Sequence, residues 1–481
     1  MNASGLFVFG LLTFIAVLTT RSISQIICCQ NTSFYDIMLA SCLKLDRGVM
    51  MDYRELYRRK LVSVEEALSN IKSSDEVVTA LAMCEPATLL RSLHTIKDRV
   101  ENVSVVNAMM QYEYDFYTKP EMNGHFLLNS WFYTDGPRAA HQQGTVSYLP
   151  MQLHQMSQKR LAYRVPNVFM GCVSPMDRHG YFTLSLSTVI EKDFIEKADI
   201  VIMEVNPRLP RTFGDTQLHI TEIDYLVESA RELPEYPLPI FTDKDRVIGD
   251  YAADLVEDGS TIQIGFGGIP GAIAHSLRHK RDLGVHSEMF TDAVLNLWES
   301  GAITNRKKSI WKDKFICDIA MGTRKLFDFL DDNVAVEFHR GVVVNDPAVI
   351  ARNHKMVSIN SALQFDLTGQ CTAESVGPRL YSGTGGHKEF INGALDSPGG
   401  KSILALYSTA ANDTVSRIVP QFDAGTVVTT SRVDVDYIVT EYGVACLRGR
   451  SVRERVGELI SIAHPDFRDY LQSEASRLQL W

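Results

Sequence analysis

From residue 52 onward, short apolar runs alternate with stretches whose apolar residues recur three and four positions apart. Apolar, β-branched runs of about four to eight residues are typical of buried strands, and the second spacing is typical of helices. The pattern predicts strands at 76–81, 103–109, 126–132, 145–148, 168–173, 181–186, 200–204, 261–264, 315–321, 334–338, 356–360, 402–406, 426–429 and 437–440. It predicts helices at 52–61, 63–71, 87–93, 150–158, 189–197, 325–330, 346–353 and 452–462. Because strands and helices alternate, we expect an α/β fold with largely parallel sheets.

A stretch with three prolines at 232–245 interrupts both periodicities and marks the expected domain boundary. We therefore expect a targeting or presequence segment at 1–50, an N-terminal domain at 51–235 and a C-terminal domain at 246–481. Residues 73–93 align with residues 257–277 as a polar turn, a strand, a loop, a proline and a helix. This internal echo favours two related α/β domains.

The first fifty residues carry an apolar run at 5–18, which is too short to indicate a membrane span and has the length of a signal peptide. No acidic residue precedes Asp36, and Arg21 stands among several serines and threonines, which favours an organellar transit peptide. The apolar run itself favours secretion or a membrane anchor. The residues alone leave both alternatives open.

Composition narrows the classes of function. A formal net charge of −10 argues against a nucleic-acid or anionic-membrane partner. The eight cysteines are scattered without a C-x-x-C motif, which indicates reduced thiols in an intracellular compartment. No cysteine pairs with a histidine at zinc spacing, so we expect no metal site. No G-x-S-x-G motif occurs, which argues against serine-centred hydrolysis.

The stretch 258–297 is the first candidate for chemistry. A predicted strand runs into Gly265, Gly267 and Gly268, and a helix is expected to begin near Pro270. Such a loop presents backbone N–H groups to the crevice above the strand ends, where open α/β sheets bind ligands. We expect Glu288, between the next strand and helix, to lie beside the same crevice. From its position alone it is a nucleophile, a general base or a helix-capping acid.

A second glycine cluster contains Gly383, Gly385 and Gly386, and its composition suggests close backbone approach to a ligand or to the other domain. A flexible hairpin is the plainer interpretation. Asn360, at the end of the predicted strand 356–360, is a candidate donor to a ligand, although an asparagine at a strand end is commonly a turn former.

Together these stretches resemble the acetyl-CoA hydrolase/transferase family of CoA-transferases, and most closely its 4-hydroxybutyrate and acetate:succinate CoA-transferase branch. The resemblance spans about residues 51–471. Its motifs are GFGGIP at 265–270, GVHSEM at 284–289, MGT at 321–323, SGTGG at 382–386, TTSR at 429–432, VTEYG at 439–443 and AHP at 463–465.

This resemblance implies two open α/β CoA-transferase-like domains of the NagB/RpiA type, with the active site at their interface. It implies that Glu288 attacks an acyl-CoA thioester and becomes a glutamyl-CoA thioester, from which a carboxylate takes the CoA. The glycine loop that cradles the thioester region falls on Gly265, Phe266, Gly267, Gly268 and Ile269, and the second glycine cluster falls on 383–386. Because the glutamate must be ionised to attack, we expect polar surroundings for Glu288 and not an apolar pocket, which would raise its pKa.

The resemblance therefore implies a ping-pong CoA-transferase acting between acetyl-CoA and a short carboxylate such as succinate. The alternatives are an acetyl-CoA hydrolase and a non-catalytic protein that binds CoA or another metabolite. Coenzyme A is expected as a substrate, with no tightly bound cofactor. We expect acyl-CoA and carboxylate ligands, no nucleic acid, no membrane for the mature enzyme and a homo-oligomer. A mitochondrial location fits this chemistry, with the cytoplasm or secretory entry as alternatives.

Overall fold

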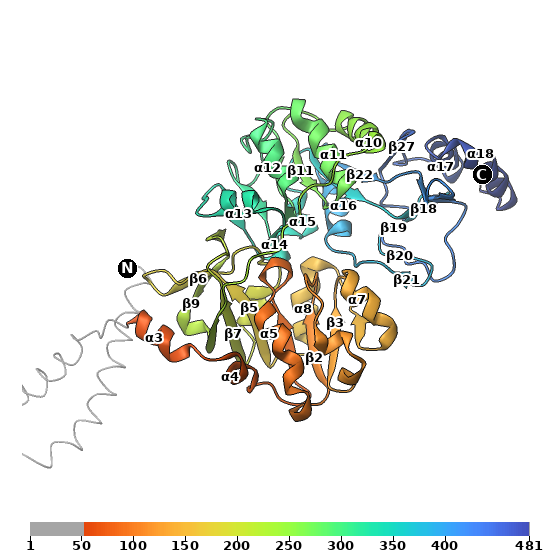
Figure 1. The fold of residues 1–481 in the computed structure, drawn as a ribbon. Coiled ribbons are helices and arrows are strands. Elements are labelled where there is room, and N and C mark those ends of the chain that lie inside the picture. The colour runs from red at the N-terminus through yellow and green to blue at the C-terminus, as the bar shows by residue number, and fades with distance from the viewer. Residues whose placement is uncertain (1–51, 481) are drawn as a thin grey trace, which may run out of the picture. The chain divides into compact units, whose positions relative to one another are not determined.

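The structure is a computed structural model that describes residues 52–480 (Figure 1). The expected targeting segment at 1–50 lies outside the described residues. From Tyr53 onward the chain forms one compact unit, which contains two main sheets. The domain boundaries expected from the sequence stay predictions.

The first sheet has seven strands, and every neighbouring pair is parallel. In spatial order these are β10 (Tyr225–Glu228), β7 (Ile200–Val205), β5 (Val168–Val173), β1 (Glu76–Thr79), β2 (Val103–Asn107), β3 (Phe126–Ser130) and β4 (Val146–Tyr148). Strand β1 is central, with Val77 opposite Val105 on one side and Val168 on the other. All its residues are buried, which explains its unbroken run of strand-forming residues, since parallel strands are covered on both faces.

We call the residues up to the end of β10 the first part of the chain and the residues from α10 onward the second part. Helices of the first part surround its sheet (Figure 1). They are α3 (Tyr53–Lys60), α4 (Val64–Leu68), α5 (Ala87–Ser92), α6 (Asp115–Thr118), α7 (Asp135–Ala140), α8 (Met156–Tyr163) and α9 (Glu191–Ile195). The sequence motif S-x-x-E marks the start of α4, where the Ser63 side chain accepts a hydrogen bond of 3.2 Å from the Glu66 backbone N–H. That bond satisfies one of the free N–H groups at the start of the helix.

The second sheet has six strands and is parallel except for its last hairpin. In spatial order these are β12 (Gly284–Val285), β11 (Thr261–Ile264), β17 (Met356–Ser361), β22 (Lys401–Ala405), β26 (Tyr437–Thr440) and β27 (Gly443–Cys446). Its helices are α10 (Asp243–Asp254), α11 (Gly268–Ser276), α12 (Asp292–Glu299), α13 (Arg324–Leu330), α14 (Gly341–Val344), α15 (Pro347–Ile350), α16 (His387–Asp396), α17 (Val452–Ser461) and α18 (Pro465–Arg477). The pairs β1–α5 and β11–α11 are the strand–loop–helix units that the sequence echo predicts.

The two parts share one hydrophobic core, which runs from Val78 in the first sheet to Val439 in the second. Between the sheets, β13 (Met289–Phe290) pairs in parallel with β15 (Ile319–Ala320). On the other side of β15, Ala320 N–H donates to Leu186 O at 2.9 Å, and Thr188 N–H donates to Asp318 O at 2.8 Å. A segment of the first part thereby holds β15, and through it the start of β13.

The predicted α/β class with mostly parallel sheets is confirmed, with several local corrections. The predicted strand 426–429 is wrong, because this segment forms no backbone ladder with another strand. The Gly377 N–H donates to Thr426 Oγ1, and the Val427 N–H donates to Ser375 Oγ, so each of these bonds pairs a backbone group with a side chain. The predicted strand 181–186 shortens to β6 (Tyr181–Thr183), which pairs antiparallel with β9 (Gln217–His219) outside the main sheets. The short helices α6, α7 and α14 and the longer helices α10, α16 and α18 were not predicted. Helix α10 begins at Asp243, inside the stretch interpreted as the domain boundary, while α16 directly follows a glycine and α18 begins at a proline.

A buried ion pair ties α8 to the central strand β1. Arg160 Nε donates to Glu76 Oε1 at 2.9 Å, and Arg160 Nη2 donates to the second carboxylate oxygen. Both side chains are buried, and the second cation near Glu76, Arg164, is more exposed and lies 3.7 Å from the carboxylate. Removing Arg160 therefore leaves the buried Glu76 carboxylate with only this weaker partner.

We predict that Arg160→Met lowers the free energy of unfolding by about 3–5 kcal/mol, measured by urea denaturation. The double variant Glu76→Leu/Arg160→Met is expected to lose less, since two apolar side chains leave no unpaired charge. A single variant as stable as the wild type would contradict the structural role given to this pair.

Candidate active site

Glu288 lies at the point where the chain leaves the second sheet and enters the small sheet between the two parts. Strand β12 ends at Val285, and β13 begins at Met289. The Glu288 carbonyl accepts hydrogen bonds of 3.2 Å from the N–H groups of Asp318 and Ile319. The backbone of Glu288 is therefore fixed by the same strand β15 that the first part of the chain holds.

Two donors hold the Glu288 carboxylate. Asn345, which directly follows α14, donates from Nδ2 to Glu288 Oε2 at 3.0 Å. The backbone N–H of Gly386 also bonds the carboxylate, and Gly386 is the residue from which α16 starts. A Cβ atom at position 386 would lie 2.0 Å from Oε2, so only glycine allows this approach. The carboxylate thus sits at the N-terminus of a ten-residue helix, where the helix dipole favours negative charge.

The pKa of Glu288 is nevertheless raised to about 7, because burial and, after it, the nearby charge of Glu389 raise it more than the bonds from Asn345 and Gly386 lower it. Protein atoms surround the carboxyl group on nearly all sides, although part of its surface faces a small cavity. This corrects the expectation of polar surroundings for Glu288: its walls are mostly apolar, and two aimed donors oppose the cost of burial. Near neutral pH the group is close to half ionised.

Two further acidic side chains lie near Glu288. Asp318 is fully buried, and neither of its carboxyl oxygens has a hydrogen-bond partner among the described residues. Burial and the charge of Glu288 raise the pKa of Asp318 well above its usual range. Glu389 Oε1 lies 3.3 Å from both the His154 backbone nitrogen and its ring Nδ1.

His286 and Lys308 anchor the segment that carries Glu288. His286 is buried, its ring Nε2 lies 2.8 Å from Val344 O, and burial lowers its pKa to about 3. Lys308 is also buried and donates from Nζ to Val285 O at 2.8 Å and to Lys314 O at 2.7 Å. The His-Ser-Glu context seen in the sequence is therefore a support for the carboxylate, because His286 is neutral and turned to the backbone of α14.

A cavity of about 30 Å³ opens beside Glu288. One wall comes from the carboxyl ends of the central strands of the first sheet: Leu81 after β1, Ala108 and Met109 after β2, and Trp131 and Phe132 after β3. This is the edge at which open parallel sheets bind ligands. The acidic group thus comes from the second part of the chain and the cavity wall from the first.

The remaining lining residues are also mostly apolar. Met151, Leu153 and Met156 lie on the stretch that leads into α8, Val189 precedes α9, and Ile319 belongs to β15. Gly385 completes the lining with Glu288. The cavity therefore offers a dry, apolar space next to one carboxylate.

The second glycine cluster joins the two parts of the chain, which is one of the roles that its composition suggested. A Cβ atom at Gly383 would lie 2.2 Å from the Trp131 carbonyl oxygen, so this glycine lets the loop pack directly on the backbone after β3. Thr384 Oγ1 donates to Met151 O at 3.2 Å. The cluster thereby places Gly385 and Gly386 over Glu288 while holding the cavity wall.

The first glycine loop has other neighbours. Its contacts include the Gly265 N–H bond to Ile359 O at 2.9 Å and the edge-on contact of Phe266 with Tyr236 at 6.3 Å. Asn360 and Gln263 bond each other through both side-chain amides at 3.0 Å. Helix α11 begins at Gly268, two residues before Pro270. The predicted roles of Gly265, Phe266, Gly267, Gly268, Ile269 and Asn360 toward CoA stay predictions.

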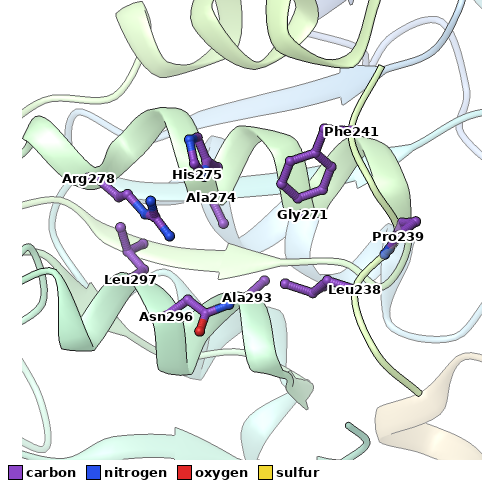
Figure 2. A pocket seen from close by; sticks show the side chains of 10 residues that line it. All are labelled: Leu238, Pro239, Phe241, Gly271, Ala274, His275, Arg278, Ala293, Asn296 and Leu297. Atoms are coloured by element: carbon purple, nitrogen blue, oxygen red, sulfur yellow. The ribbon is translucent and has the colours of Figure 1, made fainter. Parts of the chain in front are cut away.

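A second cavity, of about 210 Å³, lies between α11, α12 and the segment that precedes α10 (Figure 2). Leu238, Pro239 and Phe241 form one side, and Arg278 and Asn296 bring polar groups to the other. None of its described lining residues also lines the cavity at Glu288. This cavity is a separate feature of the second part of the chain.

The histidines His275 and His279 stand four residues apart at the end of α11, a spacing known from metal sites. No third ligand joins them: within residues 52–480, no three His, Cys, Asp or Glu side chains are grouped to hold a metal ion.

No helix in the same range is long and apolar enough to cross a membrane. The five cysteines of this range, Cys84, Cys172, Cys317, Cys371 and Cys446, are free thiols.

Comparisons with known proteins identify the family of the chain. Family models match residues 45–240 as the acetyl-CoA hydrolase/transferase N-terminal domain and residues 322–475 as the C-terminal domain. The chain is 41% identical to a succinyl-CoA:cyclohexane-1-carboxylate CoA transferase of Geobacter metallireducens, over 90% of this chain and 98% of that one. It is 42% identical to a 4-hydroxybutyrate coenzyme A transferase of Clostridium kluyveri, over 88% and 99%. The solved structure of RipA from Yersinia pestis superposes with a TM-score of 0.85 at 36% identity, over 90% and 100%. The chain therefore belongs to the acetyl-CoA hydrolase/transferase family.

Proposed function

We propose that the protein is an enzyme that transfers coenzyme A from an acyl-CoA, such as acetyl-CoA, to a short carboxylate, with Glu288 as the group that carries the CoA. The observation that carries this proposal is the Glu288 carboxylate itself. It is held by the side-chain amide of Asn345, after α14, and by the backbone N–H of Gly386 at the start of α16, and it faces an apolar cavity. The CoA transferases among the relatives support the same class of reaction.

In the first step, an oxygen of Glu288 attacks the thioester carbonyl carbon. A C–O bond forms, the C–S bond breaks, and CoA leaves as a thiolate. The thiolate then attacks the glutamyl carbonyl of the mixed anhydride, which releases the first carboxylate and leaves CoA on Glu288 as a thioester. An incoming carboxylate reverses both steps, so the kinetics are ping-pong and no net proton is taken up.

The residues around Glu288 suit these steps. Negative charge moves between the carboxylate and the reacting carbonyl oxygen, and fixed donors such as the Asn345 amide and the Gly386 N–H stabilise it without reorganisation. The apolar cavity limits access of water to the anhydride and thioester, which favours transfer over hydrolysis. The expected mitochondrial location and homo-oligomeric assembly stay part of this proposal.

We predict that Glu288→Ala lowers the exchange of labelled acetate into acetyl-CoA by at least about 10⁴-fold, because no group remains to carry the CoA. The control is Glu299→Ala, which removes an exposed glutamate of α12 that bonds Lys325 and is expected to keep wild-type exchange. Substantial exchange by Glu288→Ala would contradict the proposal. Acetate release without any acceptor, at a rate equal to transfer, would instead indicate a hydrolase.

The pKa of Glu288 predicts a pH profile. Because the attacking form is the carboxylate and burial raises its pKa to about 7, kcat/KM for the acyl-CoA should rise as pH increases through about 7 and level off above it. Asn345→Ala removes a bond that lowers this pKa, so the rising limb should move to higher pH, by about one unit. A rising limb centred near pH 4.5, the ordinary range of a glutamate, would contradict the buried environment described for Glu288.

A further inference from the structure

The charges around the cavity at Glu288 are of one sign. Its twelve described lining residues include one ionisable side chain, Glu288, and no lysine, arginine or histidine. Two further carboxyl groups, those of Glu389 and Asp318, lie near enough to Glu288 to interact with it electrostatically. The histidine next to this region, His154, already contacts Glu389. A second negative charge in the cavity would meet no described cation.

One polar group in the cavity wall has no partner. Trp131 is 2% exposed, and its Nε1–H forms no hydrogen bond with any described residue. A buried indole N–H usually finds an acceptor, and this donor has none among the described residues. As a neutral donor in apolar surroundings, it suits a neutral oxygen such as a hydroxyl or carbonyl, and it is too weak to offset the burial of an ionised carboxylate.

We propose that this cavity receives the acyl chain of the substrate and selects chains without a second charge, so that monocarboxylates are used and dicarboxylates such as succinate are disfavoured. This inference rests on the proposed transfer through Glu288. A chain ending in a second carboxylate would lose its water shell in this apolar cavity and would meet no counter-charge among the described lining residues, which raises its free energy there. The proposal departs from the succinate example that the family resemblance offered.

The size of the cavity sets a second limit. A volume of about 30 Å³ exceeds the ~10–15 Å³ that holds one water in the same measure, so it admits a group about as large as a methyl or ethyl. Longer chains require the side chains of Met109, Met151 and Met156 to move. Methionine is unbranched and changes rotamer readily, which lets an apolar site adapt to chains of different length. Adaptation of this kind adds room but no charge.

The test compares butyrate with succinate as acceptors for CoA from acetyl-CoA, since the two acids have equal numbers of carbon atoms. We expect kcat/KM for butyrate to exceed that for succinate by at least about 100-fold. Equal or better use of succinate would overturn the inference. Exchange of labelled acetate into acetyl-CoA is measured in parallel: exchange with equal use of both acids defeats this inference alone, whereas no exchange defeats the proposed function.

Two substitutions at one wall sharpen the test. Met151→Lys places a cation in the lining and is expected to raise the succinate-to-butyrate ratio of kcat/KM at least about tenfold. Met151→Leu keeps the apolar character and should leave the ratio within about twofold of wild type. A folded Met151→Lys variant with an unchanged ratio would place the distal end of the acyl chain elsewhere. If that variant does not fold, the wild-type ratio still decides.

Discussion

The approach of the α16 N-terminus to the Glu288 carboxylate is the contact on which the rest of the site depends. Gly386 admits it because any side chain would overlap the carboxylate oxygen, and Gly383 admits the neighbouring approach to the Trp131 backbone. One short glycine segment therefore joins the second sheet to the carboxyl edge of the first. It also brings the Gly386 N–H to the buried Glu288 carboxylate, which the Asn345 amide holds as well.

The same contact explains how an acid can be both buried and reactive. Burial in apolar surroundings raises the pKa of Glu288, and the two hydrogen-bond donors and the helix dipole lower it again in part by stabilising the ionised form. The result is a carboxylate that is ionised in useful amounts near neutral pH and weakly solvated. A nucleophile with few bound waters loses little solvation when it attacks, and the surrounding dipoles are already in place.

Sequence patterns alone predicted the α/β class, most strands of both sheets and the place of Glu288 beside a glycine loop, because hydrophobic periodicity and short motifs are local features. The role of Glu288 as nucleophile came from the family resemblance. The patterns did not predict Asn345, Trp131, Asp318 or Glu389, since these residues are far from Glu288 in the chain and belong to no motif with it. The pKa of Glu288 was also misjudged, because its value depends on walls supplied by the first sheet. The motif residues of the first glycine loop were identified, yet their contacts in the structure are with other neighbours.

The central claim is that Glu288 itself carries the CoA. The most direct measurement is mass spectrometry of the protein after incubation with acetyl-CoA in the absence of an acceptor carboxylate, followed by rapid acid quenching and digestion. The account predicts a mass increase of CoA minus water on the peptide that contains Glu288, and loss of that adduct when a carboxylate acceptor is added before the quench. An active protein that forms no such adduct, or forms it on another residue, would contradict the account.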